Sequence, residues 1–200
     1  KHVLGKKYED CCFIVCHIDG GISVSAHRYG RIIDCNDAAG GDGPYTPTRI
    51  GSVSVADILE YVRDKDIDEV KKLCTRTGGF VSHFGTSSSD AVHKMAEEGD
   101  KKAIRVWDGM KYQIVKYIGA MAAVLGGRVD GILLTGGLLR FEDITQTIRE
   151  QCEWIAPVST YPGEVEHEAL AAGALRVLRG EEEPKHYTGR PVWDGWHDED

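Results

Sequence analysis

A glycine turn between two strand-like segments constrains this chain more than any other feature of its sequence. Residues 11–18 are almost entirely apolar, and the Asp-Gly-Gly sequence at residues 19–21 follows them directly. Residues 22–26 then alternate apolar and small polar side chains. Because Asp-Gly readily adopts the positive φ values of a tight turn, this pattern predicts a β-hairpin. A second turn at residues 29–30 leads into residues 31–35, which predicts three adjacent antiparallel strands.

The rest of the chain alternates helical patterns with short apolar strands. Residues 101–125 place apolar side chains three, four and seven positions apart, which predicts a long central helix. Further strands are expected at 129–135 and 154–159. Since parallel strands need crossover helices, this order predicts a mixed α/β sheet in which an antiparallel meander precedes strand–helix crossovers. The other expected elements are helices over 54–64, 66–74, 87–98, 141–152 and 164–178 and a short extended segment over 78–85.

One long connection stands between the meander and the first helix. Residues 36–53 are rich in glycine and contain two prolines, which predicts a loop. Loops of this length in compact domains are usually functional.

The charge balance and the short apolar runs exclude two kinds of partner. The chain has 24 Lys and Arg against 32 Asp and Glu, a formal net charge of −8 at pH 7. This charge repels nucleic acid and anionic membranes. Its longest apolar runs, such as 118–125, fall short of the roughly 20 residues that a membrane span needs. We therefore expect no nucleic-acid partner and no membrane partner.

The cysteines indicate a reducing compartment. The six cysteines show neither a CxxC pair nor a histidine partner at zinc-finger spacing. Free cysteine in apolar segments behaves as a small hydrophobic residue, so we expect reduced core thiols and a cytoplasmic location. The chain opens with Lys1 and shows no leader, and we expect it to be part of a longer protein.

Two glycine pairs follow expected strands. The turn at 19–21 has backbone that can approach a phosphate closely, and Gly136 and Gly137 follow the buried strand 129–135. Ligands of α/β sheets bind beyond the carboxyl ends of strands. The two strand ends together suggest a nucleotide held between them.

The motifs at these positions and at several others closely resemble the butyrate kinases, within the acetate kinase family of carboxylate kinases. The resemblance extends to about residue 180 and covers only the C-terminal half of such enzymes. The matching segments are residues 17–24, 30–34, 43–51, 78–81, 119–125, 134–137 and 161–171.

This resemblance implies an actin-like ATPase fold, shared with sugar kinases, in which ATP lies between two related domains. Residues 1–180 would form the C-terminal nucleotide-binding domain, and residues 181–200 an acidic, tryptophan-containing tail. The partners that it implies are the missing N-terminal domain and a second copy in a homo-oligomer. The cofactors that it implies are ATP and Mg²⁺.

The resemblance also assigns the site residues. Arg49 matches the catalytic arginine, and a planar, always charged guanidinium suits a phosphoryl group in transfer. On the residues alone, a loop arginine is more often a surface charge, and that alternative stays open. The residues matched to the phosphates and to the rest of the nucleotide are His17, Asp19, Gly20 and Gly21, and Gly85, Ser88, Asp90, Gly136 and Gly137, respectively.

The resemblance places Glu166 and Asp34 on the magnesium side of the site, and hard oxygen ligands suit Mg²⁺. Glu164 is a close rival of Glu166, since a carboxylate in the first turn of a helix also favours the helix dipole. Asp34 can equally cap a turn, and His17 can equally be a structural group.

The implied reaction is the transfer of phosphate from ATP to a short-chain carboxylate, butyrate or a branched relative, to give the acyl phosphate. A carboxylic acid is ionised at neutral pH, so this acceptor needs no general base. Two alternatives remain: a non-catalytic ATP-binding module, and a phosphotransferase of the same fold that acts on a sugar hydroxyl and needs a base.

Three residues depart from the family pattern. Asp19 stands where glycine is usual, Asp42 where glutamate is common, and Val92 where many relatives have an arginine near the adenine. A carboxylate beside phosphates is repulsive unless a cation intervenes. The departures predict weaker nucleotide affinity.

We also expect Gly119, in the long helix, to let another backbone come close.

Overall fold

The computed structural model describes residues 5–163, 166–184, 186–187 and 189 of the chain. Contacts divide the chain into two units, Lys1–Gly163 and Glu164–Asp200. Within its described part, the second unit contains helix α7 (Glu166–Leu178). Most of the expected tail, 181–200, lies outside the described residues.

The first unit is built on a mixed sheet with the strand order β3-β2-β1-β4-β5. β1 pairs antiparallel with β2, and β2 pairs antiparallel with β3. β1 also pairs in parallel with β4, and β4 with β5, so the predicted meander and crossovers are confirmed. The strands are β1 (Cys12–Ile18), β2 (Ile22–Arg28), β3 (Arg31–Cys35), β4 (Gly131–Gly136) and β5 (Val158–Pro162).

Helices follow the strands in the expected order. Side-chain caps begin three of the predicted helices. Asp66 accepts from the Asp68 N–H, Ser88 accepts from the Ala91 N–H, and Asp100 accepts from the Lys102 and Ala103 N–H groups. In the part of the chain that the structure describes, no helix combines the length and apolar character needed to cross a membrane. The remaining elements are η1 (Tyr8–Asp10), α1 (Val55–Val62), α2 (Ile67–Thr75), α3 (Gly79–Phe84), α4 (Ser89–Glu97), α5 (Lys101–Val124), η2 (Gly137–Arg140) and α6 (Glu142–Cys152).

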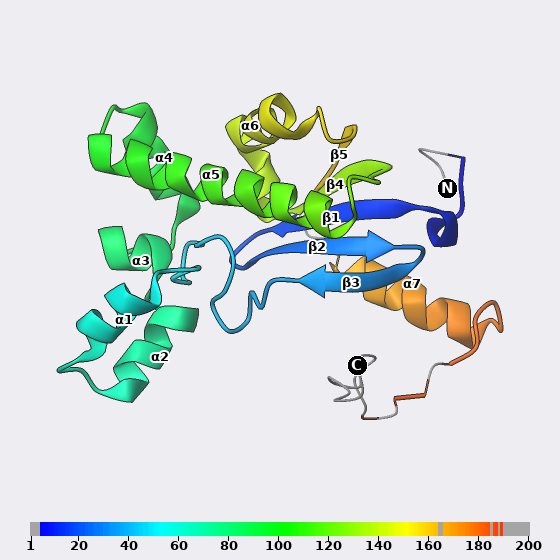
Figure 1. The fold of residues 1–200 in the computed structure, drawn as a ribbon, viewed down its shortest axis with the longest axis horizontal. Coiled ribbons are helices and arrows are strands. Elements are labelled where there is room, and N and C mark those ends of the chain that lie inside the picture. Colours follow the sequence, from blue (N-terminus) through cyan, green and yellow to red (C-terminus); the bar gives the residue numbers. More distant parts are fainter. Residues whose placement is uncertain (1–4, 164–165, 185, 188, 190–200) are drawn as a thin grey trace, which may run out of the picture. The chain divides into compact units, whose positions relative to one another are not determined.

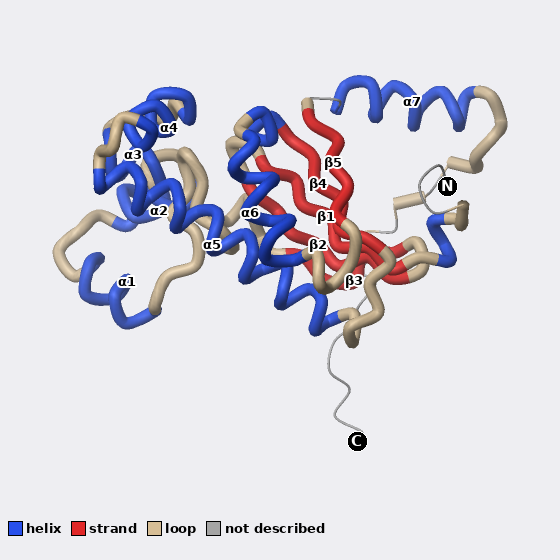
Figure 2. Tube along the Cα trace, turned by 90° about the horizontal axis from the view of Figure 1, so that it is seen from above, coloured by secondary structure: helices blue, strands red, loops and turns tan. Residues whose placement is uncertain are grey.

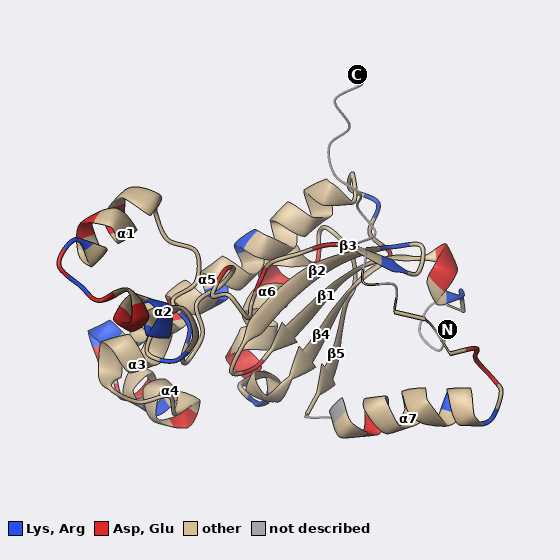
Figure 3. Cartoon of the chain, turned by 90° about the horizontal axis from the view of Figure 1, so that it is seen from below, with Lys and Arg blue, Asp and Glu red and all other residues tan. Residues whose placement is uncertain are grey.

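One face of the sheet carries the core. Ile14, Cys16 and Ile18 of β1 point to this face and are fully buried. Helices α5 and α6 cover it (Figures 1 and 2). Their apolar side chains, including Met110 and Ile148, complete the same cluster. Charged residues lie mainly on the helices and loops, whereas β1, β4 and β5 carry none (Figure 3). Burial of this apolar face stabilises the unit.

An aromatic and polar cluster joins α4, α5 and α6. His93 of α4 packs between Trp107 and Phe141, with ring centroids 4.9 and 4.6 Å away. Asp143 of α6 accepts hydrogen bonds from Trp107 Nε1 at 2.7 Å and from Lys111 Nζ at 2.9 Å. Burial alone would raise the pKa of Asp143, but the bonds from Lys111 and Trp107 outweigh it and lower the pKa. The cluster fixes Phe141, whose ring contacts Arg140 of the site described below.

Two sequence predictions of local structure are wrong. Residues 78–85 were expected to be extended, but they contain helix α3, because the N–H groups of Phe80 and Val81 donate to carbonyls of the preceding long loop and start a helix there. The last strand begins at Val158 and not at Trp154, which is exposed in a turn that ends α6.

The expected role of Gly119 is also wrong. No described heavy atom lies within 4 Å of the place where a Cβ at Gly119 would stand, so its face of α5 is open. Gly136 is the opposite case. Its φ is +108°, and an added Cβ would stand 2.7 Å from the Ile18 carbonyl carbon and 2.8 Å from the Ile18 nitrogen. The backbone of β4 therefore approaches that of β1 at a distance that only glycine permits.

These two glycines predict opposite effects of the same substitution. Gly136→Ala should destabilise the chain by about 1–3 kcal/mol, because it combines a strained φ with overpacking. Gly119→Ala should stabilise it by up to about 1 kcal/mol, because alanine is the better residue in an exposed helix interior. Urea unfolding of both variants measures the difference. A Gly136→Ala variant as stable as the parent would contradict the close approach.

Candidate functional site

The turn between β1 and β2 and the long loop meet at Gly21 and Arg49. A Cβ at Gly21 would stand 2.7 Å from Arg49 Cζ and 3.2 Å from Nη2, so the guanidinium fills the space that a side chain would take. Arg49 Nε is buried and has no hydrogen-bond partner among the described residues. The fold thus brings together two residues that are 28 positions apart in the sequence and that the sequence assigned to one site.

Thr46 holds the long loop on this turn. The side chain is buried, and its hydroxyl donates a 2.8 Å hydrogen bond to the Gly20 carbonyl. The same oxygen accepts from the Arg49 N–H at 3.0 Å and from the Thr48 N–H at 3.2 Å. Sequence reasoning did not single out Thr46. The only signal was its place in the Tyr-Thr-Pro-Thr-Arg segment of the loop.

The start of α3 supports the other side of this loop. The N–H groups of Gly78, Phe80 and Val81 donate to the carbonyls of Thr48, Thr46 and Pro47 at 3.1, 3.3 and 3.1 Å. Gly79 has a φ of +54°, and an added Cβ would stand 2.9 Å from the Arg49 carbonyl oxygen. The loop therefore has a defined backbone in spite of its glycine content.

Asn36 fixes the beginning of the same loop. Its Oδ1 accepts from the Val24 N–H at 2.7 Å, and its Nδ2 donates to the carbonyls of Ile22 and Asp42 at 3.1 and 3.0 Å. The Asp42 carboxylate in turn accepts from Ser52, and this hydrogen bond lowers the pKa of Asp42. The departure at Asp42 thus lies in the loop scaffold.

Asp19 bridges the two glycine-bearing strand ends. Its Oδ1 accepts from the Gly20 N–H at 2.7 Å, and its Oδ2 accepts from the Gly137 N–H at 2.8 Å. The carboxylate therefore satisfies two backbone donors, one at the end of β1 and one just after β4. The hydrogen bond from its N–H to Asp19 fixes the backbone of Gly137.

A cavity of about 350 Å³ opens beside this bridge. It brings together four of the predicted site residues, namely Asp19, Gly20, Ser88 and Asp90. Its other walls come from the loop that carries Arg49 and from η2. The remaining lining residues are Pro47, Thr48, Ser87, Ser89, Leu138 and Arg140.

Arg140, which sequence reasoning did not single out, spans this cavity to Asp90. Nη2 and Nε of Arg140 donate to the two carboxylate oxygens of Asp90 at 2.9 and 3.3 Å. The hydrogen bond from Arg140 lowers the pKa of Asp90. A bidentate pair of this kind fixes orientation as well as charge.

Two predicted residues lie apart from this cavity, and a third, Glu166, belongs to the second unit. Asp34 is exposed in β3, opposite Ala26, which pairs with Ile14 of β1. It is therefore displaced from the turn by about 17 Å along the strand direction, five residues at about 3.4 Å each. Gly85 ends α3 with a φ of +69° and does not line the cavity. Glu166 is the first residue of α7, and its side chain lies outside the described residues.

Two further positions are placed by the strands and helices. His17 is half-buried near the end of β1, where it pairs with Ser23 and Thr135. Val92 is fully buried in the core, so that position of α4 does not reach the cavity. Among the described residues, no group of three or more His, Cys, Asp or Glu side chains is arranged to hold a metal.

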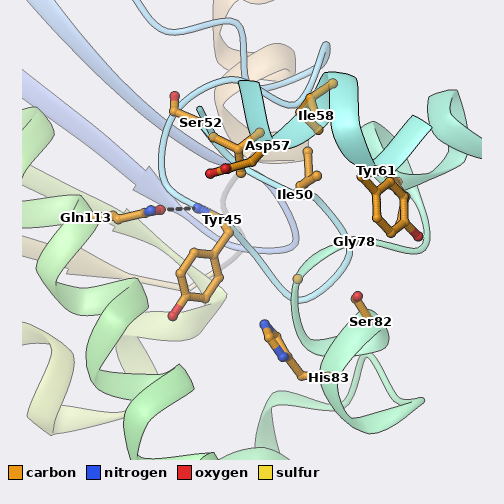
Figure 4. Close-up of a pocket in the computed structure, with 13 residues that line it drawn as sticks. Tyr45, Ile50, Ser52, Asp57, Ile58, Tyr61, Gly78, Ser82, His83 and Gln113 are labelled. Carbon is orange, nitrogen blue, oxygen red and sulfur yellow. Dashed lines mark hydrogen bonds between the residues drawn. The ribbon is translucent and has the colours of Figure 1, made fainter. Parts of the chain in front are cut away.

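A second cavity, of about 390 Å³, is lined by other residues of the long loop (Figure 4). Ile50, next to Arg49, lines it together with residues of α1, α2 and α3. Tyr45 forms one wall: its N–H donates to Gln113 Oε1 at 2.8 Å, its hydroxyl donates to the Val106 carbonyl, and burial raises its pKa to about 12. None of the predicted site residues lines this cavity.

Comparison with solved structures identifies the fold. The acetate kinase of Porphyromonas gingivalis is 21% identical, with a TM-score of 0.79 over 88% of this chain and 51% of that one. The acetate kinase of Entamoeba histolytica is 17% identical, with a TM-score of 0.74 over 85% and 53%, respectively. A propionate kinase from Francisella tularensis is 22% identical, with a TM-score of 0.63 over 70% and 38%.

The chain thus spans about half the length of the acetate kinases that it matches. The likeness confirms the predicted actin-like ATPase-type fold, which a more distant putative N-acetylmannosamine kinase from Listeria monocytogenes shares at a TM-score of 0.54. The family model of the acetokinase family matches residues 1–161. The matched residues include the turn, the loop that carries Arg49 and every residue that lines the cavity, so the chain belongs to the acetokinase family.

Proposed function

We propose that this chain is the nucleotide-binding half of a carboxylate kinase that transfers phosphate from ATP to butyrate or a branched relative. The observation that carries the proposal is the guanidinium of Arg49 against Gly21, at the turn where the phosphates would lie. Family membership supports a phosphotransferase with a carboxylate acceptor. The choice of butyrate rests on the motif resemblance alone.

The reaction asks little of acid–base chemistry. An ionised carboxylate oxygen attacks the γ-phosphorus of ATP, the new P–O bond forms, and the bond to the bridging oxygen breaks to release ADP. Catalysis then depends on positioning and on neutralising the charge of the transferring group. Arg49 has the fork of donors that suits three phosphoryl oxygens.

The buried Nε of Arg49 supports this role. An unsatisfied buried donor costs on the order of 1–3 kcal/mol. Native proteins carry such local conflicts mainly at functional sites. The Thr46 hydroxyl holds the Arg49 backbone, so the guanidinium is directed by the loop and not by a hydrogen bond from its own Nε.

For the nucleotide, we propose that His17, Asp19, Gly20 and Gly21 face the phosphates. Ser88, Asp90, Gly136 and Gly137 would border the adenosine, whereas Gly85 is left out of the proposed site because it does not line the cavity. The two backbone N–H groups that donate to Asp19 offset part of its negative charge. This offset reduces the repulsion that the sequence led us to expect at the departure from glycine.

For the metal, Mg²⁺ when bound would neutralise phosphate charge, and it usually binds through one or two carboxylates, substrate phosphates and water. Glu166 stays our proposed carboxylate. Asp34 does not fit, because its place in β3 keeps it away from the turn. We therefore assign no step to the metal.

The complete enzyme, in this proposal, has a preceding domain that closes on the nucleotide, forms a homo-oligomer and acts in the cytoplasm. The acetate kinases that the chain matches are about twice as long as the part that it covers, which supports a further domain. Residues 1–180 would form the nucleotide-binding domain, and residues 181–200 its tail.

Arg49→Ala in the complete enzyme should lower kcat by about two to four orders of magnitude, as expected for loss of a charge that acts on the transferring phosphoryl group. ATP affinity should change much less, and Arg49→Lys should recover little, because an ammonium lacks the fork. Steady-state kinetics and ATP titration provide the test, with Arg149→Ala on α6 as a surface control. A loss confined to ATP affinity would place Arg49 on the nucleotide instead.

Thr46→Val should lower kcat on the order of tenfold to 100-fold, since a displaced Arg49 no longer meets the phosphoryl group. It should also destabilise the chain by about 1–3 kcal/mol, because the Arg49 and Thr48 N–H groups lose their acceptor. Thr46→Ser keeps the hydroxyl and should restore most of kcat. If serine fails to do so while stability returns, the hydroxyl does not position Arg49.

The isolated 200-residue chain should fold and yet form no acyl phosphate from butyrate and ATP, because only one wall of the two-domain cleft is present. Acyl phosphate formation by the purified chain would show that this half suffices. In the complete protein, ATP binding without turnover on any short carboxylate would favour the non-catalytic module. Turnover on a sugar would favour the other phosphotransferase.

A further inference from the structure

Arg140 is held in one plane by bonds along its edge. Nε and Nη2 donate to the Asp90 carboxylate, and Nη1 donates to the Gly137 carbonyl at 2.9 Å. These contacts come from two directions, α4 and the start of η2. Three of the five N–H groups of the guanidinium are thereby used within the protein.

One face of the same guanidinium is covered by an aromatic ring. Arg140 Cζ lies over Phe141, 4.4 Å from the ring centroid. Phe141 is itself fixed, since it packs edge-on to Trp107 at 5.0 Å and against His93 at 4.6 Å. Arg140 therefore rests on a rigid support and has little freedom to reorient.

The rest of the Arg140 side chain is open to the cavity. It is 48% exposed and lines the cavity together with Leu138 of η2 and Ser88, the N-cap of α4. Its edge is occupied by Asp90, whose charge offsets its own, so the side chain is poorly placed to bind a phosphate. What it offers to a ligand is a flat surface next to an apolar one.

We propose that Arg140 is a base-binding residue whose guanidinium stacks on the purine base of the nucleotide, and that Asp90 is the positioning residue that holds it. This inference rests on the proposed ATP site. It gives Asp90 a different role from direct contact with the nucleotide. It also follows that the base is held without an arginine at position 92, where the buried valine makes such a contact impossible.

Stacking on a guanidinium does not read the edge of the base. The contribution of Arg140 is therefore expected to be similar for ATP and GTP and to be zero for tripolyphosphate, which has no base. This pattern distinguishes stacking from charge, because loss of a general positive field would weaken the binding of all three ligands.

Calorimetric titration of the 200-residue chain with Mg²⁺ and ATP, GTP or tripolyphosphate tests the proposal. Arg140→Ala should weaken the binding of ATP and of GTP by about 5-fold to 100-fold and leave the affinity for tripolyphosphate unchanged. Arg140→Lys should not recover ATP binding, whereas Arg140→Tyr, which restores a flat face, should recover part of it. Asp90→Ala should weaken ATP and GTP by a smaller factor than Arg140→Ala, again without effect on tripolyphosphate.

Arg149→Ala on α6 is the matched control, since Arg149 is a half-exposed arginine paired only loosely with Glu153 at 3.8 Å. It should leave all three affinities unchanged, and thermal melting should show every variant folded. Unchanged ATP affinity in Arg140→Ala would overturn the inference and leave the proposed ATP site standing. Equal loss for ATP and tripolyphosphate would also overturn it. A parent chain that binds none of the three ligands would overturn the proposed ATP site and the inference with it.

Discussion

The site depends on the close approach of two strand ends, β1 at Ile18 and β4 at Gly136. Adjacent parallel strands bring their carboxyl ends to the same edge of a sheet. Here the backbone at Gly136 lies so close to the backbone of Ile18 that a Cβ atom at position 136 would not fit. The Asp19 carboxylate then accepts one N–H from the turn and one from Gly137. Because this single side chain satisfies both donors, the turn and η2 form one rigid rim of the cavity, and neither can shift without breaking the bridge.

The long loop is hydrogen-bonded to that rim and is held in place by it. Thr46 reaches the Gly20 carbonyl, and the start of α3 donates to the carbonyls on the other side of the loop. A glycine-rich segment pays a large entropy cost to become ordered. Here the cost is offset by backbone hydrogen bonds to two fixed elements, which leaves the loop free of regular structure and yet able to aim Arg49 at Gly21.

Much of this architecture could be predicted from local patterns, because the hairpin, the capped helices and the apolar strands each encode their structure within a few residues. The structure of α3 could not, since its first N–H groups find their acceptors in a loop about 30 residues earlier. Asp34 and Val92 show the same limit for the site. Strand register carries Asp34 away from the turn, and helix periodicity turns Val92 into the core. A motif match records neither effect.

Arg49, in the loop that forms one wall of the cavity, and Arg140, which lines the cavity itself, are bonded in opposite ways. Arg140 has its edge bonded to Asp90 and Gly137 and one face on Phe141, so its orientation is fixed before any ligand arrives. Arg49 lies against a glycine and keeps a buried Nε without a partner among the described residues. A group that holds a base throughout turnover gains from bonds that never change. A group that meets charge only as it develops must keep its donors uncommitted to the protein, and the roles that we propose for the two arginines would account for this difference in bonding.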